Sequence, residues 1–159
     1  MNTKLPYCKT SESVKGYNDS KISSSETNDC VVRAIASSFD VTYDESHKFC
    51  KDSLKRENRK GVRMFVASME RYIYNGNQIF GKTVKLIGKY SNLYYDVKVK
   101  NAIKKRALTV GKFIKENQKG TFLVSVSGHA FAIKDGVVMG NIEDAQKTKR
   151  VLQSIWKIA

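Results

Sequence analysis

Two residues in this chain have the type and local setting that acyl-transfer chemistry requires, and the first is Cys30. It lies in the segment TNDCVVRAIA, at the predicted start of a helix. The thiolate is the reactive form of cysteine, and the positive end of a helix dipole lowers a thiol pKa. The backbone N–H of Cys30 is also placed to stabilise an oxyanion. The alternative interpretation is a buried cysteine that packs as a small hydrophobic side chain.

The second residue is His129, in the segment VSVSGHAFAI. It follows Gly128 between two predicted strands, an apolar setting in which an imidazole needs a polar partner. Histidine is the usual base for a cysteine nucleophile, although a satisfied core histidine is the alternative. The only other histidine, His47, lies among charged residues in DESHKF, and we expect it to face solvent. We therefore predict that His129 is the base for Cys30.

The order of these motifs resembles that of the papain-like cysteine peptidases. An acidic residue and a cysteine open an apolar helix, a Gly-His pair opens a strand about 100 residues later, and a polar residue follows the next strand. The residues concerned are Asp29-Cys30, Gly128-His129 and Asn141. The segments NDCVVRAIA and GHAFAIKDGVV are similar to those of compact papain-like proteins of bacteria and their phages, some of the bacteriocin-processing type. The resemblance implies a peptidase or amidase that forms a thioester acyl-enzyme.

The family uses a third residue to orient the histidine, and here the sequence leaves alternatives. Asn141, which lies 12 residues after His129, is the first choice, because an antiparallel strand would return it beside the imidazole. Asp135 competes, but it precedes Gly136 in a predicted hairpin turn. Asp144 is a lesser candidate. The resemblance therefore implies a Cys-His-Asn/Asp triad of Cys30, His129 and Asn141.

The oxyanion hole is where this sequence departs from the family pattern. The family has a glutamine a few residues before the cysteine, whereas residues 22–27 read ISSSET. The side-chain amide of Asn28 is the substitute donor, in competition with a helix-capping role, and the N–H of Cys30 is the second donor. Because this glutamine is missing, a catalytically inactive relative of the family remains an alternative interpretation.

The remaining cysteines and the termini bear on compartment and cofactors. Cys8, Cys30 and Cys50 are an odd number without CxxC spacing, which favours neither a disulfide framework nor a zinc site. Cys50 is expected in the core. No apolar leader and no membrane-spanning run is evident, so we expect a cytoplasmic protein, in the host cytoplasm if a phage encodes it. No nucleotide or metal motif is present, and no cofactor is expected.

The order of predicted elements, with helices first and strands after them, indicates an α+β fold that would position these residues. The resemblance implies that this fold is papain-like. Helices are expected after residue 30, from Thr42 with Glu45 as a capping box, and over 62–74. A short helix follows Thr109, and the C-terminal third predicts an antiparallel sheet. Residues 92–105 fit a strand or a helix. We expect an irregular segment at 1–27 and one catalytic domain at 28–159.

The charge of the chain suggests partners besides a protein or peptide substrate. Lys and Arg number 29 against 15 acidic residues, a net charge of +14. Such a surface attracts nucleic acid or acidic protein. The alternative function is therefore a basic nucleic-acid- or acidic-protein-binding module on the same fold, catalytically inactive. The sequence does not indicate an oligomeric state.

Overall fold

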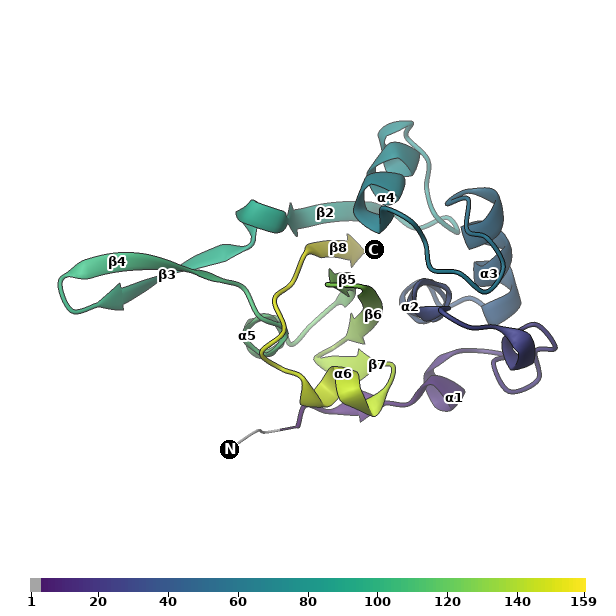
Figure 1. The fold of residues 1–159 in the computed structure, drawn as a ribbon, viewed down its shortest axis with the longest axis horizontal. Coiled ribbons are helices and arrows are strands. Elements are labelled where there is room, and N and C mark those ends of the chain that lie inside the picture. The colour runs from purple at the N-terminus through teal and green to yellow at the C-terminus, as the bar shows by residue number, and fades with distance from the viewer. Residues whose placement is uncertain (1–3) are drawn as a thin grey trace.

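The computed structural model describes residues 4–159 as an α+β fold (Figure 1). The helices are α1 (Thr10–Ser13), α2 (Cys30–Phe39), α3 (Tyr43–Asp52), α4 (Phe65–Tyr74), α5 (Val110–Glu116) and α6 (Ile142–Gln146), with 3-10 turns η1 (Ser23–Ser25) and η2 (Tyr90–Asn92). The strands are β1 (Tyr7–Cys8), β2 (Val84–Lys89), β3 (Tyr94–Val99), β4 (Ala102–Ala107), β5 (Thr121–Val126), β6 (His129–Lys134), β7 (Val137–Met139) and β8 (Ser154–Ile158). Within residues 4–159, no helix is long and apolar enough to cross a membrane.

One sheet of six strands organises the molecule, in the order β1-β7-β6-β5-β8-β2. Neighbours run antiparallel except β1 and β7, which are parallel. The C-terminal strands β5, β6, β7 and β8 pair antiparallel, as the sequence predicted, but the added parallel strand β1 makes the whole sheet mixed. The difference arises because the N-terminal segment supplies a strand: Tyr7 and Cys8 align with Val138 and Met139. Such a two-residue edge strand carries no periodic signal.

Two layers of helices enclose this sheet (Figure 1). On one face α2, α3 and α4 form a core with Leu123, Ala130 and Trp156. On the other face α5 and α6 form a second core with Phe122, Val124 and Phe131. Alternate residues of β5 and β6 thus serve opposite layers, as the two-residue period of a strand requires. At the start of β6, His129 and Ala130 therefore point to opposite faces of the sheet.

The helix that begins with Cys30 is held firmly. Its buried side chains are Val31, Val32, Ala34, Ile35, Ala36, Ser38 and Phe39. Each large apolar side chain buried in this way contributes about 1.5–3 kcal/mol. The strand under it presents Ala130 and Ala132, whose small side chains allow α2 to lie close to β6. Asp40 ends the helix in the left-handed conformation. The nucleophile candidate therefore sits on a rigid element.

The capping box at Thr42 is confirmed, with Thr42 and Glu45 bonded reciprocally, as is the helix after Thr109. The segment that fitted either helix or strand is a hairpin, since β3 pairs with β4 along its whole length. This hairpin forms a separate two-stranded sheet that extends away from the body (Figure 1). The sequence did not predict α6, which follows β7 directly.

Candidate active site

Cys30 is the first residue of α2, as expected. Asp29 occupies the N-cap position, but its side chain makes no capping hydrogen bond, and neither does that of Asn28. The helix ladder begins with the bond from the Arg33 N–H to the Asp29 carbonyl. The N–H groups before Arg33 therefore have no partner within the helix. An uncapped helix start beside a thiol provides both a positive potential and free donors.

The Asp29 carboxylate does not cap α2 but contacts two side chains that fix the start of the helix. Its Oδ2 accepts a hydrogen bond of 2.8 Å from the buried Tyr43 hydroxyl. Its Oδ1 lies 3.1 Å from Nε of Arg33. Burial and the bond to Asp29 raise the pKa of Tyr43, so that its hydroxyl stays a donor. The residue before the nucleophile is thus fixed from two sides.

His129 is the first residue of β6, and its ring is oriented by a carboxylate. Nε2 lies 2.8 Å from Oδ1 of Asp144. The ring is also stacked on Phe131, with the centroids 5.9 Å apart. Because Nε2 is engaged by Asp144, the other ring nitrogen, Nδ1, is the one left for the Cys30 thiol.

The carboxylate that contacts the imidazole is that of Asp144, and neither Asn141 nor Asp135 takes this place. Asp144 is buried, with both of its oxygens bound: Oδ1 also accepts from Arg150 at 2.8 Å, and Oδ2 from the Asn141 N–H at 3.2 Å. Asn141 is the N-cap of α6, and its side-chain oxygen accepts from Arg33 at 3.1 Å.

The geometric expectation that a returning strand would bring Asn141 to His129 is corrected by this arrangement. The chain leaves β7 after Met139 and turns into α6, which carries Asp144 to the ring in its first turn. Asp135 lies in the turn between β6 and β7, where its Oδ1 accepts from the Gly120 N–H at 2.9 Å. It performs the turn role that its sequence context indicated.

The electrostatics of the site favour a charged pair. Burial acts to raise the pKa of the Cys30 thiol, but hydrogen bonds with His129 and the Ala130 N–H, and the charges of His129 and Arg33, hold it below its usual value. Bonds to Asp144 and then Cys30 raise the pKa of His129 from 6.5 to about 9. Burial opposes ionisation of Asp144, yet His129 and Arg150 keep its pKa low. These directions favour a thiolate beside an imidazolium over a neutral pair.

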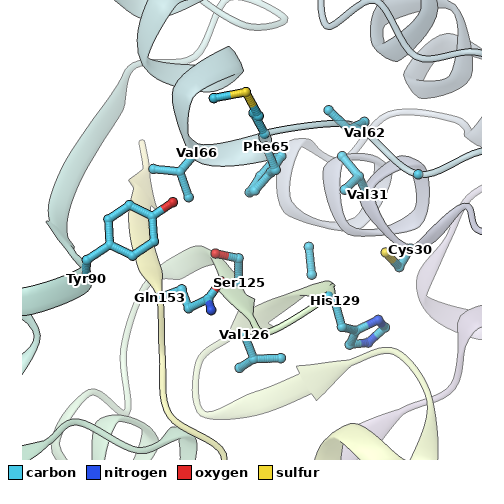
Figure 2. A pocket seen from close by; sticks show the side chains of 14 residues that line it. Cys30, Val31, Val62, Phe65, Val66, Tyr90, Ser125, Val126, His129 and Gln153 are labelled. Atoms are coloured by element: carbon cyan, nitrogen blue, oxygen red, sulfur yellow. The ribbon is translucent and has the colours of Figure 1, made fainter.

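A cleft of about 280 Å³ opens next to this pair (Figure 2). Figure 2 shows Cys30 and His129 at one end of the cleft and Tyr90 at the other. Apolar side chains form much of its wall, namely Val31, Val62, Phe65, Val66 and Val126. Polar groups come from Ser125, Gln153 and Tyr90. The cleft thus combines the Cys30 thiol with apolar and polar lining groups.

Asn28, the expected second oxyanion donor, is otherwise engaged. Its side-chain amide donates to the carbonyl of Arg59 at 3.1 Å, and its backbone has a positive φ of 53°. Asn28 is not among the residues that line the cleft within the described chain. The backbone N–H groups at the start of α2, including that of Cys30, are the remaining candidates for oxyanion donors.

The other cysteines and the other histidine lie outside the cleft. Cys50 is fully buried, as expected, and burial raises its pKa to about 12. Cys8 is part of β1. The expectation that His47 faces solvent is wrong: it is buried, with Nε2 3.0 Å from Oε2 of Glu26. Its helix, α3, packs that side against the segment that precedes α2.

Sequence reasoning underrated Asp144 and missed Arg33, Arg150 and Tyr43. One local signal in the sequence pointed to Asp144. Asn141 followed three residues later by Asp144 is a capping-box spacing, and the structure forms that box. Arg150 reaches Asp144 from a loop, and Tyr43 comes from another helix. Such contacts between distant segments have no signature along the chain.

Comparison of the chain with protein-family models, with curated proteins and with solved structures gave no match. What the site can do therefore rests on its own geometry and chemistry.

Proposed function

We propose that this protein is a cysteine hydrolase of papain-like type, which cleaves amide bonds in a protein or peptide. The observation that carries the proposal is the connected set Cys30–His129–Asp144 at the mouth of a cleft. The thiol begins a helix, the imidazole begins a strand, and the carboxylate fixes the imidazole. A nucleophile, a base and an orienting group in this relation are the parts that acyl transfer requires.

The proposed reaction has two steps. In the first, the Cys30 thiolate forms a bond to the amide carbonyl carbon, and the oxyanion is stabilised by N–H donors at the start of α2. The His129 imidazolium donates its Nδ1 proton to the amine as the C–N bond breaks, which leaves a thioester. In the second, His129 removes a proton from water, the hydroxide displaces the thiol, and the acid is released. Asp144 holds the ring throughout.

The cleft supports an amide substrate with an apolar side chain near the scissile bond. The apolar wall formed by Val62, Phe65 and Val66 faces the strand end that carries His129 (Figure 2). A charged small molecule would leave this wall without a complementary surface. Peptides with aliphatic or aromatic residues are therefore the substrates to test first.

The test begins with the three thiols of the chain. Near neutral pH, we expect iodoacetamide to label Cys30 faster than Cys8 or Cys50, because the Cys30 pKa is lowered and it lines the cleft. His129→Ala should remove this preference. The labelled peptides are identified by mass spectrometry. Equal labelling rates at all three thiols would defeat the proposal.

Turnover is measured with a library of fluorogenic peptide amides. We expect release of the fluorophore and, in rapidly quenched samples, a thioester adduct on Cys30. Cys8→Ser is the matched control and should retain the wild-type rate. A selective Cys30 without turnover of any amide or ester would indicate the inactive relative.

A further inference from the structure

The β3–β4 hairpin stands apart from the rest of the fold. Its strands pair only with each other, in six consecutive rows from Tyr94–Ala107 to Val99–Ala102. Six residues of extended chain span about 20 Å. Figure 1 shows the hairpin projecting from the body as a two-stranded ribbon, on the side away from α3. None of its residues belongs to either core cluster, so packing of the body does not explain its presence.

The base of the ribbon is firmly anchored. Leu93 is buried in the core around α5, and its carbonyl accepts the Leu108 N–H at 2.8 Å. Tyr95 lies under the ammonium group of Lys112 from α5, 4.4 Å from the ring centroid. The ribbon is thus held at its root while its tip is free of contacts with the body, which is the construction of a preorganised arm.

The arm carries a concentrated positive charge. Residues 94–107 contain five cations against one acid, Asp96. The cations are Lys98, Lys100, Lys104, Lys105 and Arg106, all exposed. Within residues 4–159, none of them lies in a salt bridge, whereas Lys48, Lys112 and Lys147 on the helices are each paired with a carboxylate. The charge of the arm is therefore not neutralised by the protein itself.

The strand register distributes this charge over both faces of the ribbon. Lys98 and Lys105 share one face with Tyr94, since each lies in an alternate row. Lys104 and Arg106 lie on the other face, paired with Val97 and Tyr95. A flat acidic protein surface would meet only one of these faces. A groove with phosphates along both walls would meet both.

We propose that the β3–β4 hairpin is an arm that binds duplex DNA by entering a groove. The major groove is about 12 Å wide and admits a two-stranded ribbon. In this position the cations on the two faces contact phosphates on opposite walls, while Ile103, which is 73% exposed, and Tyr94 share the face of Lys98 and Lys105 and contact the sugars of that wall. The inference does not depend on the hydrolase activity.

The experiment measures binding of the full-length protein to a fluorescein-labelled 20-base-pair duplex by fluorescence anisotropy between 50 and 200 mM NaCl. The test variant is K98Q/K104Q/K105Q/R106Q. The matched control is K21Q/K48Q/K51Q/K60Q, which removes the same charge from exposed lysines in and around α3. Cys30→Ala separates this inference from the proposed chemistry, because it should bind DNA as the wild type does.

We expect the arm variant to bind at least about 100-fold more weakly at 50 mM salt, because each phosphate contact contributes about 0.9 to the slope of log K against log salt. The control should change affinity by less than about fivefold, and K98R/K104R/K105R should retain binding, which excludes a folding defect. Equal losses in the two glutamine variants, or no binding by the wild type, would overturn the proposal. So would tighter binding to a polyglutamate peptide than to DNA, which would indicate an acidic protein partner.

Discussion

The molecule contains two sets, each made of a cysteine, a histidine, a carboxylate and an arginine, and their thiols differ in the direction of the pKa shift. The first comprises Cys30, His129, Asp144 and Arg150, and the second comprises Cys50, His47, Glu26 and Arg56. In both, an imidazole nitrogen lies within 3.0 Å of a carboxylate oxygen that an arginine also contacts. In both, that carboxylate is only 4% exposed.

The two sets differ in what surrounds the thiol. Cys30 begins a helix and lines a cleft, and although burial acts to raise its pKa, His129, the Ala130 N–H and Arg33 hold that pKa below its usual value. Cys50 lies within α3, is fully buried, and has its pKa raised by burial to about 12. The comparison teaches that residue types do not determine reactivity. The groups that face each thiol decide the direction of its pKa: His129, the Ala130 N–H and Arg33 outweigh burial at Cys30, whereas burial outweighs the charge of Arg56 at Cys50.

The second set has a structural role next to the first. Glu26 accepts the Arg59 N–H at 2.9 Å, and Arg56 donates to the Thr27 carbonyl at 3.0 Å. These bonds attach the segment that leads into Cys30 to the loop that provides one wall of the cleft. The first set therefore performs chemistry in our proposal, while the second fixes the chain that supports it.

The largest contrast is expected between the two cysteines. Cys30→Ala should lower kcat/KM by about 10³-fold or more, because the nucleophile is lost, while the melting temperature stays close to that of the wild type. Cys50→Ala should keep kcat/KM within about twofold and lower the free energy of unfolding by about 1 kcal/mol through a small cavity. Peptide-amide assays and denaturant unfolding measure both. If Cys50→Ala were the inactive variant, the assignment of the two sets would be reversed.

Substitution of Asp144 should mainly affect activity, whereas substitution of Glu26 should mainly affect stability. Asp144→Asn should lower kcat on the order of 10²-fold, since His129 loses the charge that orients it and stabilises its protonated form. Glu26→Gln should leave kcat nearly unchanged but destabilise the fold by about 3 kcal/mol, because Arg56 remains buried without its counter-charge. The comparison uses kcat together with urea unfolding. A stability loss alone in Asp144→Asn would remove it from the triad.

The pH dependence of kcat/KM should depend on Cys30, His129 and Asp144 of the first set, and not on the second set. The thiolate is lost as pH falls through the lowered pKa of Cys30, and the imidazolium is lost as pH rises through about 9, so kcat/KM should be bell-shaped. In Asp144→Asn the alkaline limb should move to lower pH, because Asp144 is the main cause of the raised His129 pKa.

The same pKa has a consequence for stability. A raised histidine pKa stabilises the fold fully below its ordinary value of 6.5, and this contribution disappears as pH rises through about 9. We expect His129→Gln to abolish that part of the pH dependence of unfolding. His47→Gln is the control and should leave the alkaline limb of kcat/KM in place; an alkaline limb that vanished in this variant would contradict the assignment.

The smallest effect is expected at Arg33, which contacts both Asp29 and Asn141. Arg33→Gln should lower kcat/KM by about fivefold, because a partly exposed charge interaction contributes at most about 1 kcal/mol. The acid limb should move to higher pH, since the Arg33 charge helps to lower the Cys30 pKa. Stopped-flow alkylation of Cys30 across pH measures this shift directly. An unchanged acid limb would limit Arg33 to a structural role.

The sequence predicted the elements whose signals are local. The apolar stripe after Cys30, the Thr42–Glu45 capping box, Thr109 as an N-cap and the Asp135-Gly136 turn each lie within a few residues, so backbone hydrogen bonding and burial follow from the pattern. Residues 92–105 carry mixed periodicity, and only the pairing of β3 with β4 resolved them. For β1 and α6 the elements are too short to generate a period.

By itself, the sequence identified Cys30 at a helix start and His129 at a strand start, because both depend on the residues immediately around them. Tertiary structure decided which carboxylate reaches the imidazole, since Asp144 arrives on a helix that begins only after the chain leaves the sheet. It also decided that His47 is buried, and that Cys30 and Cys50 differ in pKa. These properties depend on desolvation and on contacts between distant segments, which exist only once the sheet and its two helical layers have assembled.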